Sequence, residues 1–169
     1  MSTFEATHVV VLSSRPFNEV VETFEALIGG TPPPEQWDAL FHDLVYADAS
    51  WQEVTQAVGS LIGPSGFLCM LKIDLGSLLS LQGRKKESIR YIIGNPLIAN
   101  QMIEHNSQAG LYAPLNVLVY QDEGGQTTIA YDLPSSQMRP FGNPSITAVA
   151  QMLDTKLAEL VAHALGNNA

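Results

Sequence analysis

The sequence is poor in charge and in cysteine, and each shortage excludes a class of protein. Charged residues make up only 15% of the 169 residues, whereas hydrophobic residues make up 46%. Because this much apolar surface can offset the entropy of ordering, we expect a folded chain rather than a disordered one. The low charge also leaves apolar surface available for a pocket or a partner.

Basic residues are outnumbered, with 8 Lys and Arg against 17 Asp and Glu, and the net charge is −9. Such a surface repels nucleic acid and anionic membranes. The basic run Arg84-Lys85-Lys86 is typical of a solvated loop. No apolar stretch reaches the roughly 18 residues of a membrane span, and Met1 to Thr7 lacks the pattern of a signal peptide. We therefore expect a soluble cytoplasmic protein that binds neither nucleic acid nor membranes.

The single cysteine, Cys69, excludes an internal disulfide. It lies in the apolar run Phe67 to Leu71, which favours a small buried core residue over a nucleophile, because nothing nearby in sequence would lower the thiol pKa. The histidines show no metal-ligand spacing; they are His8, His42, His105 and His163. We expect no metal and no cofactor, and no Walker, Rossmann or Gly-x-Ser-x-Gly pattern is present.

Residue patterns predict a mixture of strands and helices. Strands are expected at 8–13, 67–74, 88–93, 115–121 and 126–132. Helices are expected at 17–28, 36–46, 50–61, 97–105 and 145–165, with a short helical or irregular piece at 75–81. Helices do not alternate strictly with strands, and the last two strands form a hairpin. The pattern therefore predicts an α+β fold, a two-layer sandwich with helices on one face of a mainly antiparallel sheet of about five strands.

The chain length predicts a single domain over 1–169. Its C-terminal amphipathic helix, 145–165, carries the clearest apolar stripe. The segment 31–60 begins with a stiff proline run and is expected to form a helical insertion or lid. An apolar patch there on Trp37, Phe41 and Trp51 would suit contact with a partner.

Several short pieces between Phe67 and Pro134 follow one another in a specific order. They are a strand ending in Ile73-Asp74, the run Ile93-Gly94-Asn95-Pro96, the strand entry Ala113-Pro114-Leu115, the turn Asp122 to Gly125, and Ile129 to Asp132. This order resembles the bacterial and archaeal "domain of unknown function 302" family. The resemblance implies a compact two-layer α/β domain that forms homodimers, and it implies no known reaction. The family often has a histidine after the isoleucine-aspartate pair, where this chain has Leu75, so any role of that histidine is absent here.

Two residues are candidates for proton transfer. Asp74 ends a predicted strand, and its carboxylate could act as a general base if burial raised its pKa. The alternative is a capping or ion-paired aspartate, and Lys72 lies two residues earlier on the same face of the strand. His105 ends a predicted helix, where a cation also suits the helix dipole.

Three further residues are candidates for ligand binding, together with Lys72. Arg90 lies within a predicted strand and either pairs with Asp74 or binds a ligand carboxylate through its forked donors. Asn95 stands between a strand and a helix, where it either caps the helix or adds a donor to a site at the helix start. Tyr112 is a candidate ligand contact, with core packing as its alternative.

We predict that an apolar cleft between sheet and helices holds a small organic ligand, with Asp74, Arg90 and Asn95 converging on it. One alternative is a cofactor-independent isomerase, cyclase or lyase that uses Asp74 or His105 for proton transfer. Another is a non-catalytic subunit that contacts a partner through segment 31–60. The ligand and enzyme hypotheses require that Asp74 and Arg90 lie on the same face of the sheet.

Overall fold

The computed structural model describes residues 3–30, 34–83 and 86–166, and for 34–38 it describes the backbone alone. Three features singled out in the sequence therefore lie wholly or partly outside the described residues. These are the proline run at Pro32 and Pro33, the basic pair Arg84-Lys85, and the side chain of Trp37.

The sheet has five strands in the order β1-β5-β4-β3-β2, and every neighbouring pair is antiparallel. The strands are β1 (His8–Ser13), β2 (Leu68–Asp74), β3 (Ser88–Gly94), β4 (Leu115–Gln121) and β5 (Thr127–Asp132). All five lie within a residue of the predicted ranges. The hairpin between β4 and β5 is confirmed, and its turn is held by Asp122, whose Oδ1 accepts from Gly124 N at 2.8 Å.

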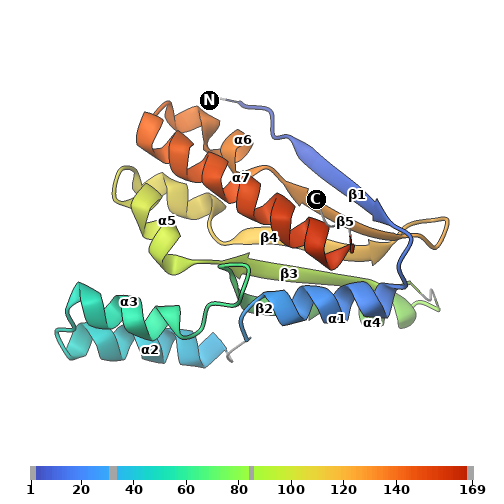
Figure 1. The fold of residues 1–169 in the computed structure, drawn as a ribbon, viewed down its shortest axis with the longest axis horizontal. Coiled ribbons are helices and arrows are strands. Elements are labelled where there is room, and N and C mark those ends of the chain that lie inside the picture. Colours follow the sequence, from blue (N-terminus) through green and yellow to red (C-terminus); the bar gives the residue numbers. More distant parts are fainter. Residues whose placement is uncertain (1–2, 31–33, 84–85, 167–169) are drawn as a thin grey trace.

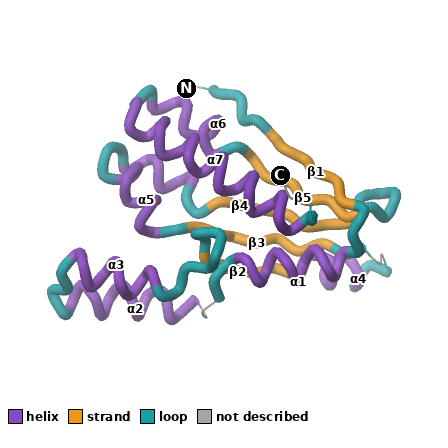
Figure 2. The backbone as a smooth tube through the Cα atoms, viewed as in Figure 1, coloured by secondary structure: helices purple, strands orange, loops and turns teal. Residues whose placement is uncertain are grey.

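Three helices cover one face of this sheet, and they are α1 (Phe17–Leu27), α5 (Pro96–Ile103) and α7 (Pro144–Ala164). In Figures 1 and 2, α7 lies over the strands, with α1 and α5 near different parts of α7. The predicted α+β architecture is therefore confirmed. Four shorter pieces are α4 (Leu75–Ser80), α6 (Pro134–Met138), and the 3-10 turns η1 (Ser107–Tyr112) and η2 (Arg139–Phe141). Helix α6 and the two 3-10 turns are not among the predicted elements.

The core lies between the helices and the sheet face that they cover, here called the helix face. Side chains alternate along each strand, so Tyr91, Val117 and Ile129 point toward the helices and are fully or almost fully buried. The predicted stripe of α7 packs onto them; its buried members are Ile146, Ala150, Leu153, Leu157, Leu160, Val161 and Ala164. The opposite face, here called the outer face, carries exposed apolar side chains such as Val10 and Leu12.

Helices α2 (Pro34–Tyr46) and α3 (Trp51–Gly59) form a hairpin that projects from one end of the molecule (Figure 1). Ser50 begins α3 with the predicted capping box, because its side chain accepts from Glu53 N while the Glu53 carboxylate accepts from Ser50 N. At the base of the hairpin, Gly29 N donates to Phe67 O at 2.9 Å. A Cβ on Gly29 would lie 1.9 Å from Leu61 O, so only glycine allows the outgoing and returning chain to approach this closely.

Candidate functional site

Asp74 and Arg90, the two residues on which the predicted cleft depends, lie on opposite faces of the sheet. Directly opposed residues in an antiparallel pair share a face. Asp74 is opposed to Ile89 on the helix face, whereas Arg90 is opposed to Ile73 and Leu118 on the outer face. The structure therefore does not bring the Asp74 carboxylate and the Arg90 guanidinium together.

Asp74 is the N-cap of α4. Its Oδ1 accepts from Ser77 N at 2.8 Å, and Ser77 Oγ donates to its Oδ2. These hydrogen bonds from Ser77 lower the pKa of the exposed Asp74 carboxyl. Asp74 is therefore a capping residue, as the alternative prediction had it. A general base would require the pKa of its carboxyl to be raised, and here it is lowered.

Lys72 is held by an acidic residue of α1 on the helix face. Its Nζ lies 2.6 Å from Glu25 Oε1, and the hydroxyl of Tyr91 donates to the same oxygen at 2.6 Å. Burial, and then the hydrogen bond to Glu25, raise the pKa of Tyr91 well above its ordinary value. The three side chains tie β2 and β3 to α1, which is a structural role.

His105 and Tyr112 lie apart from these groups. The His105 side chain is 40% exposed in the turn after α5, with its Nε2 3.9 Å from Glu104 Oε1. The Tyr112 ring contacts Phe4 and Phe141 edge-on, with centroid separations of 5.9 and 6.0 Å. Tyr112 is therefore packed between two other rings, which agrees with core packing, the alternative to a ligand contact.

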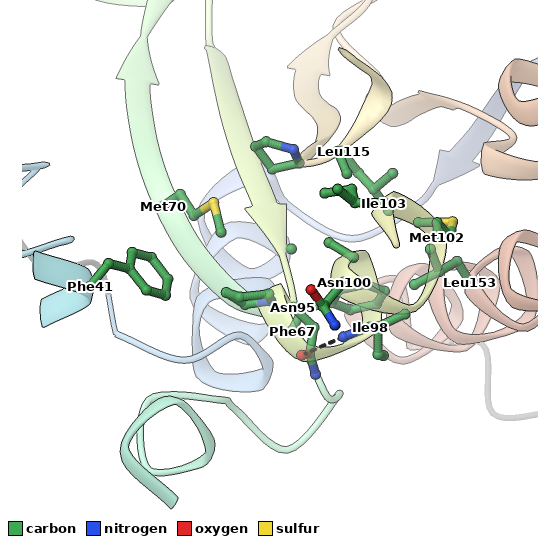
Figure 3. Close-up of a pocket in the computed structure, with 15 residues that line it drawn as sticks. Phe41, Phe67, Met70, Asn95, Ile98, Asn100, Met102, Ile103, Leu115 and Leu153 are labelled. Carbon is green, nitrogen blue, oxygen red and sulfur yellow. Dashed lines mark hydrogen bonds between the residues drawn. The ribbon is translucent and has the colours of Figure 1, made fainter. Parts of the chain in front are cut away.

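A pocket opens where β3 passes into α5, and Figure 3 shows its lining. Its volume is about 220 Å³. The larger apolar side chains come from several elements and are Phe41 of α2, Phe67 and Met70 around the start of β2, Ile98, Met102 and Ile103 of α5, Leu115 of β4 and Leu153 of α7. The pocket is therefore built by segments that are far apart in the sequence.

Asn95 forms one rim of this pocket and is the only predicted site residue that lines it. Its Oδ1 accepts from Leu97 N at 3.0 Å and Ile98 N at 3.3 Å, which caps α5, and its Nδ2 donates to Gly66 O at 3.0 Å. The predicted capping role is thus present, and the same side chain ties α5 to the turn that precedes β2.

The Ala113–Pro114 segment, whose peptide bond is cis, also lines the pocket. A Cβ on Gly94 would lie 3.2 Å from Pro114 Cβ, so glycine at this position allows the segment to approach the end of β3. Met70 lies at a β-bulge, where the register of β2 against β3 shifts between Cys69 and Leu71. Sequence reasoning did not predict Met70, Pro114 or Phe41 as site residues, and Gly94-Asn95-Pro96 was the signal closest to them.

The lining has few groups that could carry out chemistry. Of the fifteen lining residues that the structure describes, none has a titratable side chain, and the polar side chains are those of Asn95 and Asn100. Across the described ranges, no group of three or more His, Cys, Asp and Glu side chains is arranged to hold a metal ion. Among the same residues, no helix combines the length and the apolar character that crossing a bilayer requires.

Comparison with known proteins gives a family and a fold. The chain is similar to the crystal structure of an uncharacterized conserved protein DUF302 from Bacillus stearothermophilus, with a TM-score of 0.62 and 19% sequence identity over 93% of this chain and 97% of that one. No curated protein matches the chain. The family model described as "Domain of unknown function DUF302" matches residues 44–164. Because this match covers more than half of the chain, the protein belongs to the DUF302 family.

Proposed function

We propose that the chain binds a small apolar organic molecule with one polar group in the pocket between β3 and α5. The observation that carries this proposal is the lining, in which apolar side chains from α2, α5, α7, β2 and β4 surround one hollow (Figure 3). Ligand pockets are typically concave and mostly apolar, with a few polar groups that orient the bound molecule.

The size of the pocket favours a compact ligand. A dry apolar cavity of about 150 Å³ takes up benzene, so a volume of about 220 Å³ suits a molecule slightly larger than a single ring. Met70 and Met102 add adaptability, because the flexible thioether side chain adjusts to different apolar shapes. An aromatic bicycle such as indole matches this volume and this lining.

Two amides supply the hydrogen-bonding groups. One hydrogen of Asn95 Nδ2 is given to Gly66 O, and its second hydrogen has no acceptor among the described residues. The side chain of Asn100 makes no hydrogen bond within the described part of the chain and lies on the lining. A ligand N–H could donate to the side-chain oxygen of Asn100, and a ligand hydroxyl could also accept from the second hydrogen of Asn95 Nδ2. One polar group on an apolar body therefore fits better than none.

The same lining favours binding over catalysis at this pocket. General acid–base chemistry requires a titratable group within hydrogen-bond reach of the reacting atom, and none of the described lining residues supplies one. Asp74 and His105, the candidates for proton transfer, lie outside the lining. An isomerase, cyclase or lyase is therefore the weaker proposal here.

The proposal is tested by titrating indole into the protein and into two matched variants by calorimetry. Ala99 lies on α5 in the pocket lining, so Ala99→Leu should fill the hollow and weaken indole binding about tenfold or more. Ala158→Leu makes the same change at an exposed position of α7 and should leave binding intact. Equal affinity in all three proteins, or no binding to any of them, would remove the proposal.

A homodimer is a second proposal, and the exposed apolar side chains of the α2–α3 hairpin favour it. The exposed fractions are 79% for Val45, 78% for Tyr46 and 59% for Trp51. Large apolar side chains grouped on a surface usually mark an interaction site. A groove of about 430 Å³ lies between this hairpin and the start of α5, lined in part by Phe41, Leu44 and Trp51. A second copy, docking hairpin against hairpin, would cover these side chains, and a two-fold arrangement is the commonest oligomer.

A further inference from the structure

Another hollow lies on the outer face of the sheet, away from the pocket at α5 and the groove at the α2–α3 hairpin. It is an open groove of about 480 Å³ that crosses β1, β5, β4 and β3. Its lining includes the polar side chains of His8, Arg90, Asn116, Tyr120 and Asp132 and the apolar side chains of Leu118 and Ala130. From these residues we infer that the groove binds a short-chain carboxylic acid that carries a second hydrogen-bonding group.

Arg90 supplies a cation that no described carboxylate neutralises. Its Nε and Nη2 donate to Asn116 Oδ1 at 3.1 and 2.6 Å, and no carboxylate of the described residues lies within ion-pair distance of it. Asn116 is a neutral amide, so it orients the guanidinium without cancelling its charge. The Nη1 donors remain for a ligand, and a carboxylate is the group that best matches them.

The position of Arg90 makes this unpaired charge unusual. The net charge of the chain is −9, and Arg90 stands in the middle of a sheet face with the apolar side chains of Ile73 and Leu118 directly opposite it on the neighbouring strands. Arg15, Lys72 and Lys86 each have an acidic partner. Arg139 and Lys156 have none among the described residues, as with Arg90, but they lie on a 3-10 turn and on a helix rather than on the sheet. An isolated guanidinium beside an apolar surface attracts an anion that also has an apolar part.

His8 and Asp132 form the other end of the groove. His8 Nδ1 lies 2.7 Å from Asp132 Oδ1, and this contact orients the imidazole and leaves Nε2 without a partner among the described residues. Arg90 reaches over β4 and the His8–Asp132 pair lies over β5, and neighbouring strands are about 5 Å apart. A ligand of about four carbons can therefore place its carboxylate at Arg90 and a hydroxyl at His8, with its chain over Leu118 and Ala130.

Butyrate and 3-hydroxybutyrate are the probes that test this inference, since they differ by one hydroxyl. Their binding is followed by NMR through the side-chain Nε–H of Arg90 and the ring C–H signals of His8. We expect saturable shifts of both residues, and about threefold to tenfold tighter binding of 3-hydroxybutyrate, as one added hydrogen bond gives. The Ala99→Leu variant should bind both acids as the wild type does, which separates this groove from the pocket at α5.

Substitutions of single residues test which side chains bind the two acids. Arg90→Gln should weaken both acids about tenfold or more, because a charge-assisted hydrogen bond is lost, whereas His8→Phe should remove only the advantage of 3-hydroxybutyrate. Arg139→Gln changes an exposed arginine of η2 and is the matched control. The inference is overturned if neither acid gives saturable shifts, or if Arg139→Gln weakens binding as much as Arg90→Gln. It is also overturned if the Arg90 signal shifts on protein dilution and not with acid, because a second copy would then cover this face.

Discussion

The hydroxyl of Tyr91 lies 2.6 Å from Oε1 of Glu25, and this contact joins the middle of the sheet to α1. Tyr91 is fully buried, so its hydroxyl needs a partner inside the protein. Glu25 is the partner, and Lys72 Nζ contacts the same carboxylate oxygen at 2.6 Å. One acidic residue of α1 thereby satisfies a tyrosine from β3 and a lysine from β2.

Removing this hydroxyl should destabilise the fold. We expect Tyr91→Phe to lower the free energy of unfolding by about 1.5 kcal/mol, the contribution of a hydrogen bond to a charged group. Urea denaturation followed by circular dichroism measures the change. Tyr46→Phe is the control, because Tyr46 is 78% exposed and its loss of a hydroxyl should have almost no effect. Equal stability of Tyr91→Phe and wild type would contradict the structural role given to this contact.

The raised pKa of Tyr91 predicts a loss of stability in alkali. The unfolded chain ionises its tyrosines near pH 10, whereas burial and the hydrogen bond to Glu25 hold Tyr91 neutral in the folded state. The stabilising contribution is therefore complete below about pH 10 and is lost as the pH rises above it. Wild type should lose stability more steeply than Tyr91→Phe over this range, and parallel curves would contradict the assignment. Tyr131, whose pKa is also raised, is present in both proteins.

The two helix caps Asn95 and Asn143 form a matched pair for testing the pocket rim. Each precedes a proline and accepts from the two backbone N–H groups that begin its helix. Asn95 alone of the two also donates to Gly66 O. Asn143→Ala should cost about 1 kcal/mol of stability, and Asn95→Ala about 1 kcal/mol more. Thermal unfolding compares them, and equal losses would show that the Gly66 link contributes nothing.

The base of the α2–α3 hairpin can be tested with neighbouring glycines. Gly29→Ala places a methyl group against Leu61 O and should lower the free energy of unfolding by about 2 kcal/mol or more. At Gly30 an added Cβ would meet no atom within 4 Å, so Gly30→Ala should be tolerated. If both variants are equally stable by denaturant titration, the close approach at Gly29 is not as described.

The proposed homodimer predicts a change of mass with specific substitutions. Val45→Ser combined with Trp51→Ser removes two of the most exposed apolar side chains of the hairpin and should convert a dimer to a monomer in sedimentation velocity. Leu12→Ser, at a 53% exposed position of the outer sheet face, should leave the dimer intact. A monomeric wild type, or a dimer that only Leu12→Ser disrupts, would contradict the assignment to the hairpin.

Local features of this chain are predictable because short-range interactions determine them. The capping box of Ser50 and Glu53 joins side chain and backbone three residues apart, and the stripe of α7 repeats at helical spacing. Strand boundaries follow the same logic, since β-branched and aromatic residues mark them. The turns η1 and η2 and the five-residue helix α6 carry no such repeat, so the sequence does not predict them.

The arrangement of polar side chains across the sheet is not predictable in this way. A shift of one residue in strand register moves every side chain to the other face, and the bulge between Cys69 and Leu71 produces such a shift in β2. The placement of Asp74 opposite Ile89, and of Arg90 on the other face, therefore depends on pairing that the sequence does not display. The pocket likewise depends on the meeting of Met70, Pro114 and Phe41, which lie far apart along the chain.

Methionine methyl groups give the most direct test of ligand binding at the pocket. Met70 and Met102 line it, Met138 is buried outside this lining as the last residue of α6, and Met152 lies on α7 and is 39% exposed. With the methyl groups labelled with carbon-13, a titration with indole should produce saturable shifts at Met70 and Met102 and leave Met138 and Met152 unchanged. Shifts that are equal at these four of the five methionines, or absent from Met70 and Met102, would contradict the proposed pocket.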